Sequence, residues 1–442
     1  MGGPWRFQYQ PRVDWPGAFL LLITRECMED VMTTGSNIRF ARRMEELPPY
    51  LFGMINKIKI EKRLSGEDVI DLGMGNPTDP TPEAVVSKLC DVVQNPKSHG
   101  YPVAEGLRNL RREIARFYKK DYGVTLDSKS EVICTIGSKE GISHMCLAVI
   151  GPGDNVLVPA PAFPIHIYAS IIAGGNVIRI PLASEESFLK RIAVMCESII
   201  PRPKLLMLNY PHNPTSTLAS QEFFREIVRL AKKYHFLILH DFAYAKITFD
   251  GYEAPSFLET PGARDVGIEF GSFSKSYNMA GWRIGYCVGN SQLIGGLAKI
   301  KGYYDYGIFS PIQIAGIVAL QDCDSDVLKQ AKIYQLRRDI LCNGLERMGW
   351  TIDRPRAGMY IWAKIPQPFD KMGSMDFVRY LAKHANVTMS PGIGFGEEGE
   401  GYVRIALVEN EHRIRQALKQ MRRALADLKH HERLEAEPVA VA

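Results

Sequence analysis

Short apolar runs alternate with segments of helical periodicity between Glu131 and Gly289. The clearest helical segment runs from Glu222 to Tyr234, where apolar residues recur at the spacing of one helix face. Strands that alternate with helices predict an α/β domain whose sheet is mostly parallel. The predicted strands are Val132–Ile136, Asn155–Val158, Val177–Ile180, Leu205–Leu208, Phe236–Leu239, Gly267–Phe270 and Ile284–Val288.

The pattern changes after Asp322, which indicates a second and smaller domain. Residues Asp326 to Met348 have the periodicity of one long amphipathic helix. Shorter elements follow it. The predicted strands are Trp350–Asp353, Met359–Lys364 and Tyr402–Ala406, and the predicted helices are Met375–His384 and Glu411–Lys429.

These patterns divide the chain into segments. We expect a disordered N-terminal extension at residues 1–36, an N-terminal arm and part of the small domain at 37–79, a large domain at 80–322, a small domain at 323–430 and a flexible tail at 431–442. One hypothesis for the extension is that synthesis starts at Met28 or Met32. Its apolar run, Gly17–Ile23, is too short to span a membrane and has no cleavage-site pattern.

Composition and charge are those of an ordinary soluble globular protein, with 46% hydrophobic and 23% charged residues. With 442 residues the chain is long enough for two domains. A formal net charge of +5 gives no reason to expect nucleic acid or an anionic membrane as a partner. The eight cysteines contain no CxxC pair, so we expect reduced, buried thiols in a cytoplasmic protein, without disulfides or a metal site. They are Cys27, Cys90, Cys134, Cys146, Cys196, Cys287, Cys323 and Cys342.

One lysine stands among small hydroxyl residues in the stretch SFSKSYNMAGWR, which runs from Ser272 to Arg283. Such surroundings are typical of a lysine that holds pyridoxal phosphate (PLP) as a Schiff base. Lys275 would be that lysine. Ser272, Ser274 and Arg283 are close enough in sequence to bind the phosphate group of the cofactor.

A carboxylate and a phenol follow a predicted strand in His240-Asp241-Phe242-Ala243-Tyr244. Ligands of parallel sheets bind at the carboxyl ends of the strands, where Asp241 could pair with the protonated pyridine nitrogen of PLP. An N-cap or turn aspartate is the commoner explanation of a lone Asp at such a place. Tyr244 alone fits a core residue.

The loop Asn209–Thr215 also follows a predicted strand, and its two prolines force extended or turn geometry. The Asn213 amide could hydrogen-bond the phenolate oxygen of the cofactor. A rigid loop without a ligand explains the same residues equally well.

Residues Thr135 to Glu140 lead from a strand into an apolar helix. The helix N-terminus and the Ser138 hydroxyl would make an anion site that suits a phosphate. The alternative is an ordinary capping box, although Gly141 stands where that motif has Glu.

Arg404 lies inside the apolar run GYVRIAL and needs a partner there. A substrate carboxylate would match its planar guanidinium, whereas a structural salt bridge is the commoner alternative.

Other sequence features give weaker evidence of function. The run GIGFG precedes an acidic turn and is not a dinucleotide loop, and His166 and His212 have no metal-ligand spacing.

The order of these features resembles that of the class I/II aminotransferases, PLP enzymes of fold type I. The resemblance runs from about Arg39 to about Leu428 and is carried by GMGNP, HGY, TIGSKEG, PIHIY, SKSYNMAGWRIG and SPGIGFG. Within the family it is strongest to bacterial glutamate–pyruvate (alanine) aminotransferases and weaker to LL-diaminopimelate and aspartate aminotransferases. It implies a large domain with a mostly parallel seven-stranded sheet, a smaller α+β domain, and a homodimer with shared active sites.

The resemblance also implies roles for single residues. Lys275 would hold PLP and then move a proton, Asp241 would pair with the pyridine nitrogen, and Asn213 and Tyr244 would bind the phenolate oxygen. The implied binding residues are Ser138, Lys139, Ser272, Ser274 and Arg283 for the phosphate, Phe163 for the ring face, Gly75, Asn213 and Arg404 for the substrate carboxylate, and Tyr101 for the phosphate in the other subunit's site.

The sequence departs from the family pattern at several points. Phe163 stands where many relatives have Trp or Tyr, and Ser216 follows Asn-Pro-Thr where Gly is usual. No arginine is identified for a side-chain carboxylate of the substrate. This puts aspartate in doubt as the preferred donor and leaves the acceptance of glutamate unexplained.

The sequence thus predicts a ping-pong transaminase, with L-alanine and 2-oxoglutarate as the first candidates. Transamination of LL-diaminopimelate, aspartate or another amino acid stays open, as does a PLP-dependent C–S lyase, which needs a leaving group at Cβ. A non-catalytic PLP-binding sensor fused to a DNA-binding domain is disfavoured, because the segment before Arg39 is too short and too weakly charged for a helix-turn-helix domain.

Overall fold

The computed structural model describes residues 39–49 and 51–436. Residues 39–46 belong to a separate unit that contains the short 3-10 helix η1, Arg42–Met44. The chain from Leu47 onward forms the second unit. The expected extension at 1–36, the alternative starts at Met28 and Met32, Cys27 and the tail residues 437–442 lie outside the described residues.

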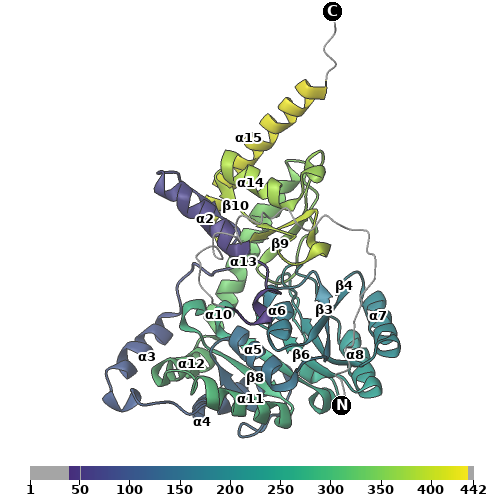
Figure 1. Ribbon diagram of the computed structural model, residues 1–442. Helices are drawn as coiled ribbons and strands as arrows, with labels where there is room; N and C mark the ends of the chain where they lie inside the picture. Colours follow the sequence, from purple (N-terminus) through teal and green to yellow (C-terminus); the bar gives the residue numbers. More distant parts are fainter. Residues whose placement is uncertain (1–38, 50, 437–442) are drawn as a thin grey trace, which may run out of the picture. The chain divides into compact units, whose positions relative to one another are not determined.

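The larger lobe of the second unit is built on a seven-stranded sheet with the order β2-β8-β7-β6-β5-β3-β4 (Figure 1). Strand β8 is antiparallel to both of its neighbours, and the remaining pairs are parallel. This confirms the mostly parallel sheet that the sequence predicts. The strands are β2 (Val132–Thr135), β3 (Asn155–Ala160), β4 (Asn176–Pro181), β5 (Pro203–Asn209), β6 (Leu237–Asp241), β7 (Gly267–Ser272) and β8 (Gly285–Gly289).

Helices cover both faces of this sheet, and its strands are therefore nearly continuous apolar runs. Neighbouring residues of β5 belong to different buried clusters, Leu206 to one face and Met207 to the other, as the two-residue period of a strand requires. The helices of this lobe are α3 (Glu83–Val93), α4 (Arg108–Tyr122), α5 (Ser138–Val149), α6 (Pro164–Ile172), α7 (Glu185–Ser198), α8 (Gln221–Tyr234), α9 (Ala263–Val266), α10 (Phe273–Ser276), α11 (Ser291–Tyr304) and α12 (Ser310–Asp322).

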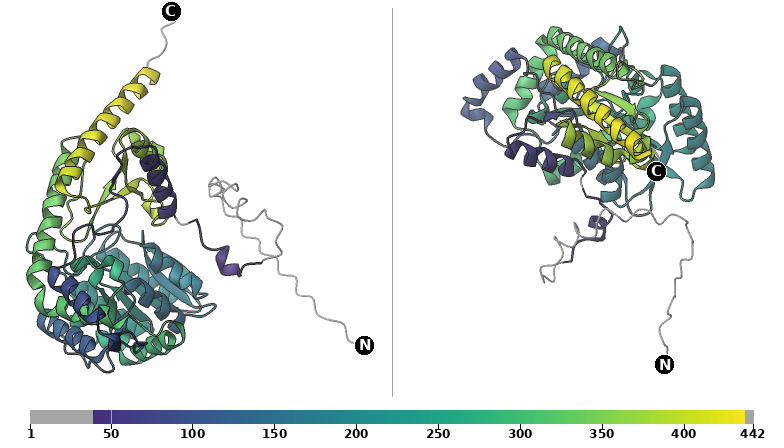
Figure 2. Two further views of the ribbon diagram at one scale, coloured as in Figure 1. Left: turned by 90° about the vertical axis from the view of Figure 1, so that its left-hand side faces the viewer. Right: turned by 90° about the horizontal axis from the view of Figure 1, so that it is seen from above.

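The smaller lobe contains two short sheets, with the orders β1-β10 and β11-β12-β9, and has its own buried core. Helix α15 packs against α13 over this lobe (Figure 2). Within the described part of the chain, no helix has the length and apolar character needed to cross a membrane. The elements are α2 (Leu51–Leu64), β1 (Ile70–Asp71), α13 (Asp324–Glu346), β9 (Tyr360–Lys364), α14 (Ser374–His384), β10 (Val387–Thr388), β11 (Ser390–Pro391), β12 (Tyr402–Ala406) and α15 (Glu411–Ala436).

Three details of the sequence prediction are wrong. Residues 350–353 form no strand, because Trp350 turns into the core, where its ring lies 5.7 Å from that of Phe377 and its Nε1 donates to the Lys364 carbonyl at 2.6 Å. Helix α15 continues to Ala436, past the predicted end at Lys429 and into the segment expected to be a flexible tail. Cys90 is exposed, whereas the other described cysteines are buried.

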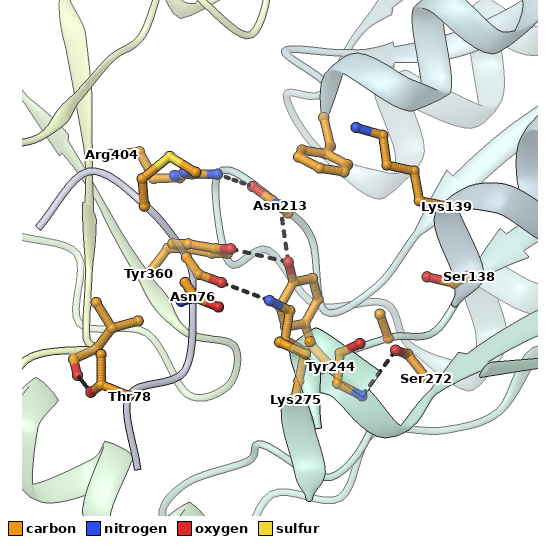
Figure 3. A pocket seen from close by; sticks show the side chains of 18 of the residues that line it. Asn76, Thr78, Ser138, Lys139, Asn213, Tyr244, Ser272, Lys275, Tyr360 and Arg404 are labelled. Atoms are coloured by element: carbon orange, nitrogen blue, oxygen red, sulfur yellow. Dashed lines mark hydrogen bonds between the residues drawn. The ribbon is translucent and has the colours of Figure 1, made fainter. Parts of the chain in front are cut away.

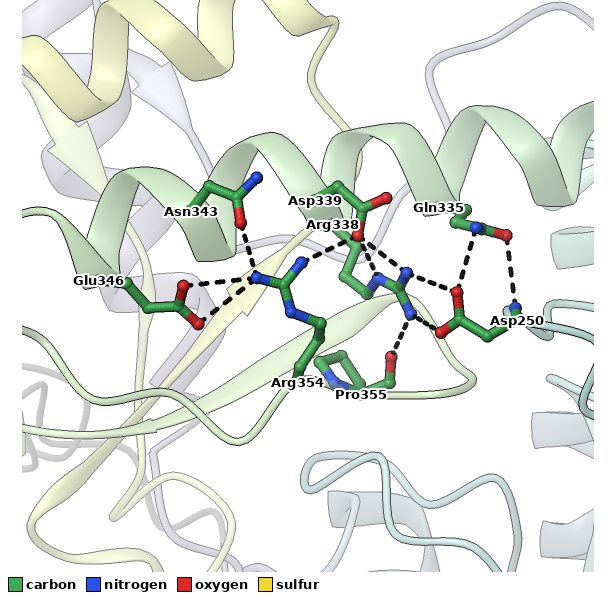
Figure 4. Close-up of polar contacts among 8 residues, drawn as sticks. All are labelled: Asp250, Gln335, Arg338, Asp339, Asn343, Glu346, Arg354 and Pro355. Atoms are coloured by element: carbon green, nitrogen blue, oxygen red, sulfur yellow. Dashed lines mark hydrogen bonds and ion pairs between the residues drawn. The ribbon is translucent and has the colours of Figure 1, made fainter.

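The long helix α13 connects the two lobes through charged contacts (Figure 4). Arg338, which is buried, pairs with Asp250 of the larger lobe at 2.5 Å and donates to the Pro355 carbonyl at 2.9 Å. Arg354 extends the network by pairing with Asp339 of α13 at 3.1 Å. A buried guanidinium with several oxygen partners holds the Asp250 loop against the helix.

Candidate active site

A cavity of about 590 Å³ lies at the carboxyl ends of the parallel strands, between the two lobes (Figure 3). The larger lobe lines it with the ends of β5, β6 and β7 and the start of α5, and the smaller lobe with α2, residues 74–78, β9 and β12. Open parallel sheets bind ligands at this edge.

Nearly all of the residues that the sequence singled out face this one cavity. Tyr101 is the exception. The lining residues that the sequence predicted are Gly75, Ser138, Lys139, Phe163, Asn213, Asp241, Tyr244, Ser272, Ser274, Lys275, Arg283 and Arg404.

Lys275 projects from α10, directly after β7, and its Nζ donates to the Gly75 carbonyl oxygen at 2.6 Å. Burial, together with the positive charges of Arg404 and Arg283, lowers the pKa of this amine below its ordinary value. A neutral amine is the form that attacks a carbonyl carbon, so these surroundings suit a Schiff-base lysine.

Asp241 ends β6 as a buried carboxylate, and its Oδ2 lies 2.9 Å from His166 Nε2. Its Oδ1 accepts a longer hydrogen bond, 3.3 Å, from the Ala243 backbone, so the turn interpretation of this aspartate is also realised. In the sequence, His166 has no metal-ligand spacing that would single it out. Its place opposite Asp241 comes from tertiary contact between α6 and β6 and has no local sequence signal.

Asn213 connects Arg404 to Tyr244. Its Oδ1 accepts from Arg404 Nη1 at 2.8 Å, and its Nδ2 donates to the Tyr244 hydroxyl at 3.0 Å. Because a guanidinium carries only donors, the amide oxygen must face Arg404, which fixes the orientation of the amide. Arg404 is 2% exposed and also donates to the Gly73 carbonyl at 2.9 Å.

Polar groups gather where α5 begins. Gly137 precedes the helix with φ of 75°, and a Cβ on it would lie 2.5 Å from Arg283 Nη2, so a side chain there would displace the arginine. Ser138 is the first helical residue and not the cap, so the capping-box interpretation is wrong. Instead, Glu140 accepts from the Ile136 N–H at 2.7 Å.

The helix start carries positive as well as hydroxyl groups. The backbone N–H groups of the first turn of an α-helix lack partners within the helix, and Ser138 and Lys139 of this turn line the cavity. Burial and the nearby Arg283 charge lower the pKa of Lys139, whose Nζ lies 6.0 Å from the Phe163 ring centroid. Opposite them, Ser272 Oγ accepts from the Ser274 N–H at 3.1 Å.

Several lining residues are not among those that the sequence predicts. For Tyr360 the pattern predicts only a place in a strand, whereas its hydroxyl lies 3.1 Å from that of Tyr244. Asn56, Lys59 and Arg63 come from α2, at positions that share one helix face. A cationic pair spaced along a surface helix predicts only a solvated face, so no sequence signal could have found it.

The unusual Ser216 has a structural explanation. Its φ of 57° is left-handed, which accounts for the glycine expected there. Its Oγ donates to the Tyr360 carbonyl oxygen at 2.8 Å, so a serine at this position supports β9.

Tyr101 lies away from the cavity. It is 91% exposed, and its ring lies 5.4 Å from that of Tyr306.

The residues of the cavity fit PLP. An anionic phosphate suits the start of α5 with Ser138 and Arg283, and a protonated ring nitrogen suits the buried Asp241. Phe163 would cover the ring face, and Asn213 and Tyr244 would meet the ring oxygen. The cavity volume of about 590 Å³ leaves room for a small substrate beside the cofactor.

Comparison with known proteins agrees with this chemistry. Residues 67–426 match the model of the family "Aminotransferase class I and II". The glutamate–pyruvate aminotransferase AlaC of Escherichia coli K12 is 49% identical over 85% of this chain and 92% of its own length. An LL-diaminopimelate aminotransferase of Moorella thermoacetica is 44% identical over 87% of this chain and 98% of its own.

A solved structure shows the same fold. The apo structure of BacF from Bacillus subtilis superimposes with a TM-score of 0.81 at 33% identity, over 87% of this chain and 98% of that one. The family model, these relatives and the cavity lead to the same conclusion: this chain belongs to the class I and II aminotransferases, which are PLP-dependent enzymes of fold type I.

Proposed function

We propose that this chain is a ping-pong transaminase that moves the amino group of L-alanine to 2-oxoglutarate, giving pyruvate and L-glutamate. The observation that carries the proposal is that Lys275 and Arg404 face one cavity and that Asn213 joins Arg404 to Tyr244. The identity with AlaC of Escherichia coli supports the choice of alanine.

The residues around Lys275 would have separate roles in binding the cofactor, moving a proton and binding the substrate. When bound, PLP supplies an electron sink for the negative charge that develops at the substrate Cα. Asp241 would keep the ring nitrogen protonated, with His166 holding the carboxylate at 2.9 Å. Lys275 would hold the cofactor and then carry the proton that leaves Cα. Arg404 would bind the α-carboxylate and so orient Cα toward Lys275.

Helix α2 offers a place for the second carboxylate of 2-oxoglutarate and L-glutamate. Lys59 and Arg63 line the cavity on its α2 side, and Lys59 pairs with Asp71 at 2.7 Å. Among the described residues, the guanidinium of Arg63 has no hydrogen-bonded partner. We infer that Arg63 is the arginine for the distal carboxylate that the sequence analysis did not identify.

LL-diaminopimelate is the second candidate donor. Glu409 lines the same cavity as Lys59 and Arg63. Opposite charges in the lining of one cavity suit a substrate whose distal group carries both an ammonium and a carboxylate. The 44% identity to the enzyme from Moorella thermoacetica also favours this candidate.

We further propose a homodimer in which Tyr101 reaches the phosphate of the other subunit's site. Large aromatic side chains are exposed near the end of α11, with Tyr101, Tyr303 and Tyr306 being 91%, 87% and 58% exposed. Exposed aromatic residues in a group are typical of an interface. The cytoplasmic location stays a prediction based on the cysteine pattern.

The test is the absorption spectrum of the protein supplied with PLP, before and after L-alanine and then after 2-oxoglutarate. We expect the band of the lysine-bound cofactor to disappear with alanine and to return with 2-oxoglutarate, while pyruvate accumulates. A response to LL-diaminopimelate without a response to alanine would favour the second candidate. Pyruvate released from a thioether amino acid without any 2-oxo acid would show a lyase. Absence of the band would contradict the role of Lys275.

A further inference from the structure

Tyr360 lies where the substrate-facing and cofactor-facing residues meet. It begins β9, is 3% exposed, and its hydroxyl is 3.1 Å from the Tyr244 hydroxyl (Figure 3). A Cβ on Gly75 would lie 2.0 Å from the Tyr360 hydroxyl oxygen. A side chain at position 75 would therefore displace this hydroxyl from its present place.

Both ends of Tyr360 are fixed. The Arg404 guanidinium carbon lies 4.1 Å from the centroid of the Tyr360 ring, a cation–π distance. Ser216 Oγ holds the Tyr360 carbonyl at 2.8 Å. The hydroxyl therefore meets Tyr244 from a fixed direction.

The hydrogen-bonding capacity of Tyr244 determines what this contact does. A phenol has one O–H donor and two acceptor positions. Asn213 Nδ2 fills one acceptor position of Tyr244 at 3.0 Å, since Arg404 holds the amide in that orientation. If Tyr244 donates its single proton to the cofactor ring oxygen, the remaining acceptor position can receive only a donor, and Tyr360 is the donor in contact with it.

We propose that Tyr360 is a positioning residue that acts through Tyr244, donating to the Tyr244 hydroxyl so that the Tyr244 O–H group serves the cofactor ring oxygen. The inference rests on the roles proposed for Lys275 and Tyr244. A hydroxyl that accepts two hydrogen bonds is a stronger donor, because such chains polarise one another. The Arg404 guanidinium also stacks on the Tyr360 ring. One side chain therefore contacts both Arg404, which is proposed to bind the substrate, and Tyr244, which is proposed to bind the cofactor ring oxygen.

The ionisation of the two phenols supports this direction. Burial acts to raise the pKa of Tyr360, but the positive charges of Arg404 and Lys275 outweigh it and lower that pKa below its ordinary value. Burial and the adjacent Tyr360 raise the pKa of Tyr244 well above its ordinary value. The more acidic phenol is the better donor, so Tyr360 donates and Tyr244 accepts.

The test is a spectrophotometric pH titration of the cofactor bound to Lys275. A hydrogen bond to the ring oxygen stabilises its negative charge and so favours loss of the proton that the oxygen shares with the lysine nitrogen. Weakening that bond must raise the measured pKa. We expect Tyr360→Phe to raise it by about half a unit and Tyr244→Phe by about one unit or more.

A double-mutant cycle separates this role from a general structural one. In the Tyr244→Phe background, Tyr360→Phe should cause no further shift. An undiminished shift there, or none in the single variant, would overturn the proposal. Tyr122→Phe is the matched control, because it deletes a buried phenol hydroxyl that does not line the cavity. An equal shift in Tyr122→Phe would also overturn it.

The apoprotein gives an independent measurement. In an ultraviolet titration, the wild-type apoprotein should contain one tyrosine that ionises below the ordinary value of about 10, and Tyr360→Phe should lack it. Coincident titrations of the two proteins would overturn the proposal. If the chain failed to bind PLP, the proposed function would fall, while this titration would still decide whether Tyr360 is the acidic phenol.

Discussion

The amine of Lys275 lies in the cavity between the two lobes, and its side chain is only partly exposed to solvent. Burial and the charges of Arg404 and Arg283 lower its pKa in the folded protein. A base with a lowered pKa binds fewer protons in the folded chain than in the unfolded chain, so its charge opposes folding at pH values below the ordinary lysine pKa of about 10.4. The stability contributed by this group therefore rises as the pH rises toward that value.

We expect Lys275→Met to raise the free energy of unfolding of the apoprotein by about 1 kcal/mol near neutral pH, because it removes a poorly solvated charge. The gain should fade as the pH rises past about 10.4, because above that value lysine is mostly neutral in both states. Urea denaturation at several pH values measures this. Lys299→Met, on the exposed face of α11, is the control and should change little. A stability gain in Lys275→Met that did not vary with pH would contradict the explanation by the buried charge. The same variant should have no transaminase activity.

Site residues were predictable where their chemistry is local. Lys275, Asp241 and Asn213 stand in short polar motifs at the ends of strands, and their residue types suggest a cofactor. Tyr360 has no such motif, because a tyrosine in an apolar strand predicts a core position. Its importance comes from contact with Tyr244, 116 residues away along the chain, which only folding creates.

At the scale of elements, α2 contributes one face to the cavity. Arg63→Gln should raise KM for 2-oxoglutarate about fivefold, which corresponds to about 1 kcal/mol for the loss of one partly solvated ion pair. The half-reaction with L-alanine, which has no distal carboxylate, should be unchanged. Lys57→Gln, on the exposed face of the same helix, is the matched control. If Arg63→Gln impaired the half-reactions with L-alanine and 2-oxoglutarate equally, Arg63 would support the fold of the site and would not bind the distal carboxylate.

Helix α13 has a stability role that can be measured separately. Arg338→Ala should cost about 2 kcal/mol in the free energy of unfolding, since it leaves the Asp250 carboxylate and the Pro355 carbonyl without their buried donor. Arg354→Ala, in the same network but more exposed, should cost less than about 1 kcal/mol. Guanidinium chloride denaturation compares the two. If Arg354→Ala lowered the free energy of unfolding more than Arg338→Ala, the conclusion that Arg338 makes the main connection between the lobes would be wrong.

The sequence predicts a strand best where the strand is long enough to contain several apolar residues. Strands β1, β10 and β11 contain two residues each, too few for any periodicity. The predicted strand at 350–353 failed for the opposite reason, because Trp350 and Ile352 alternate with polar residues although no neighbouring strand pairs with them. Local pattern cannot report whether a pairing partner exists.

For the whole molecule, periodicity predicted a parallel sheet and a second domain, but it could not place one lobe against the other. That arrangement decides the site, since Arg404 and Gly75 come from the smaller lobe and Lys275 from the larger. Among the sequence features, only the family resemblance carries this information. The partition of the chain at residues 79 and 322 stays a prediction.

Sharing of active sites between subunits can be tested by mixing two variants. Lys275→Met destroys the cofactor linkage of its own site, and Tyr101→Phe keeps the exposed ring but removes the hydroxyl proposed to reach the other subunit's phosphate. We expect Tyr101→Phe alone to weaken PLP binding severalfold, through the loss of one charge-assisted hydrogen bond.

If active sites are shared between subunits, a hybrid dimer of the two variants has one site with both substitutions and one site with neither. Random exchange should then restore tight PLP binding to about a quarter of all sites. If Tyr101 serves only its own subunit, no hybrid site is intact and mixing restores nothing. Titration of the cofactor band before and after subunit exchange distinguishes the two cases.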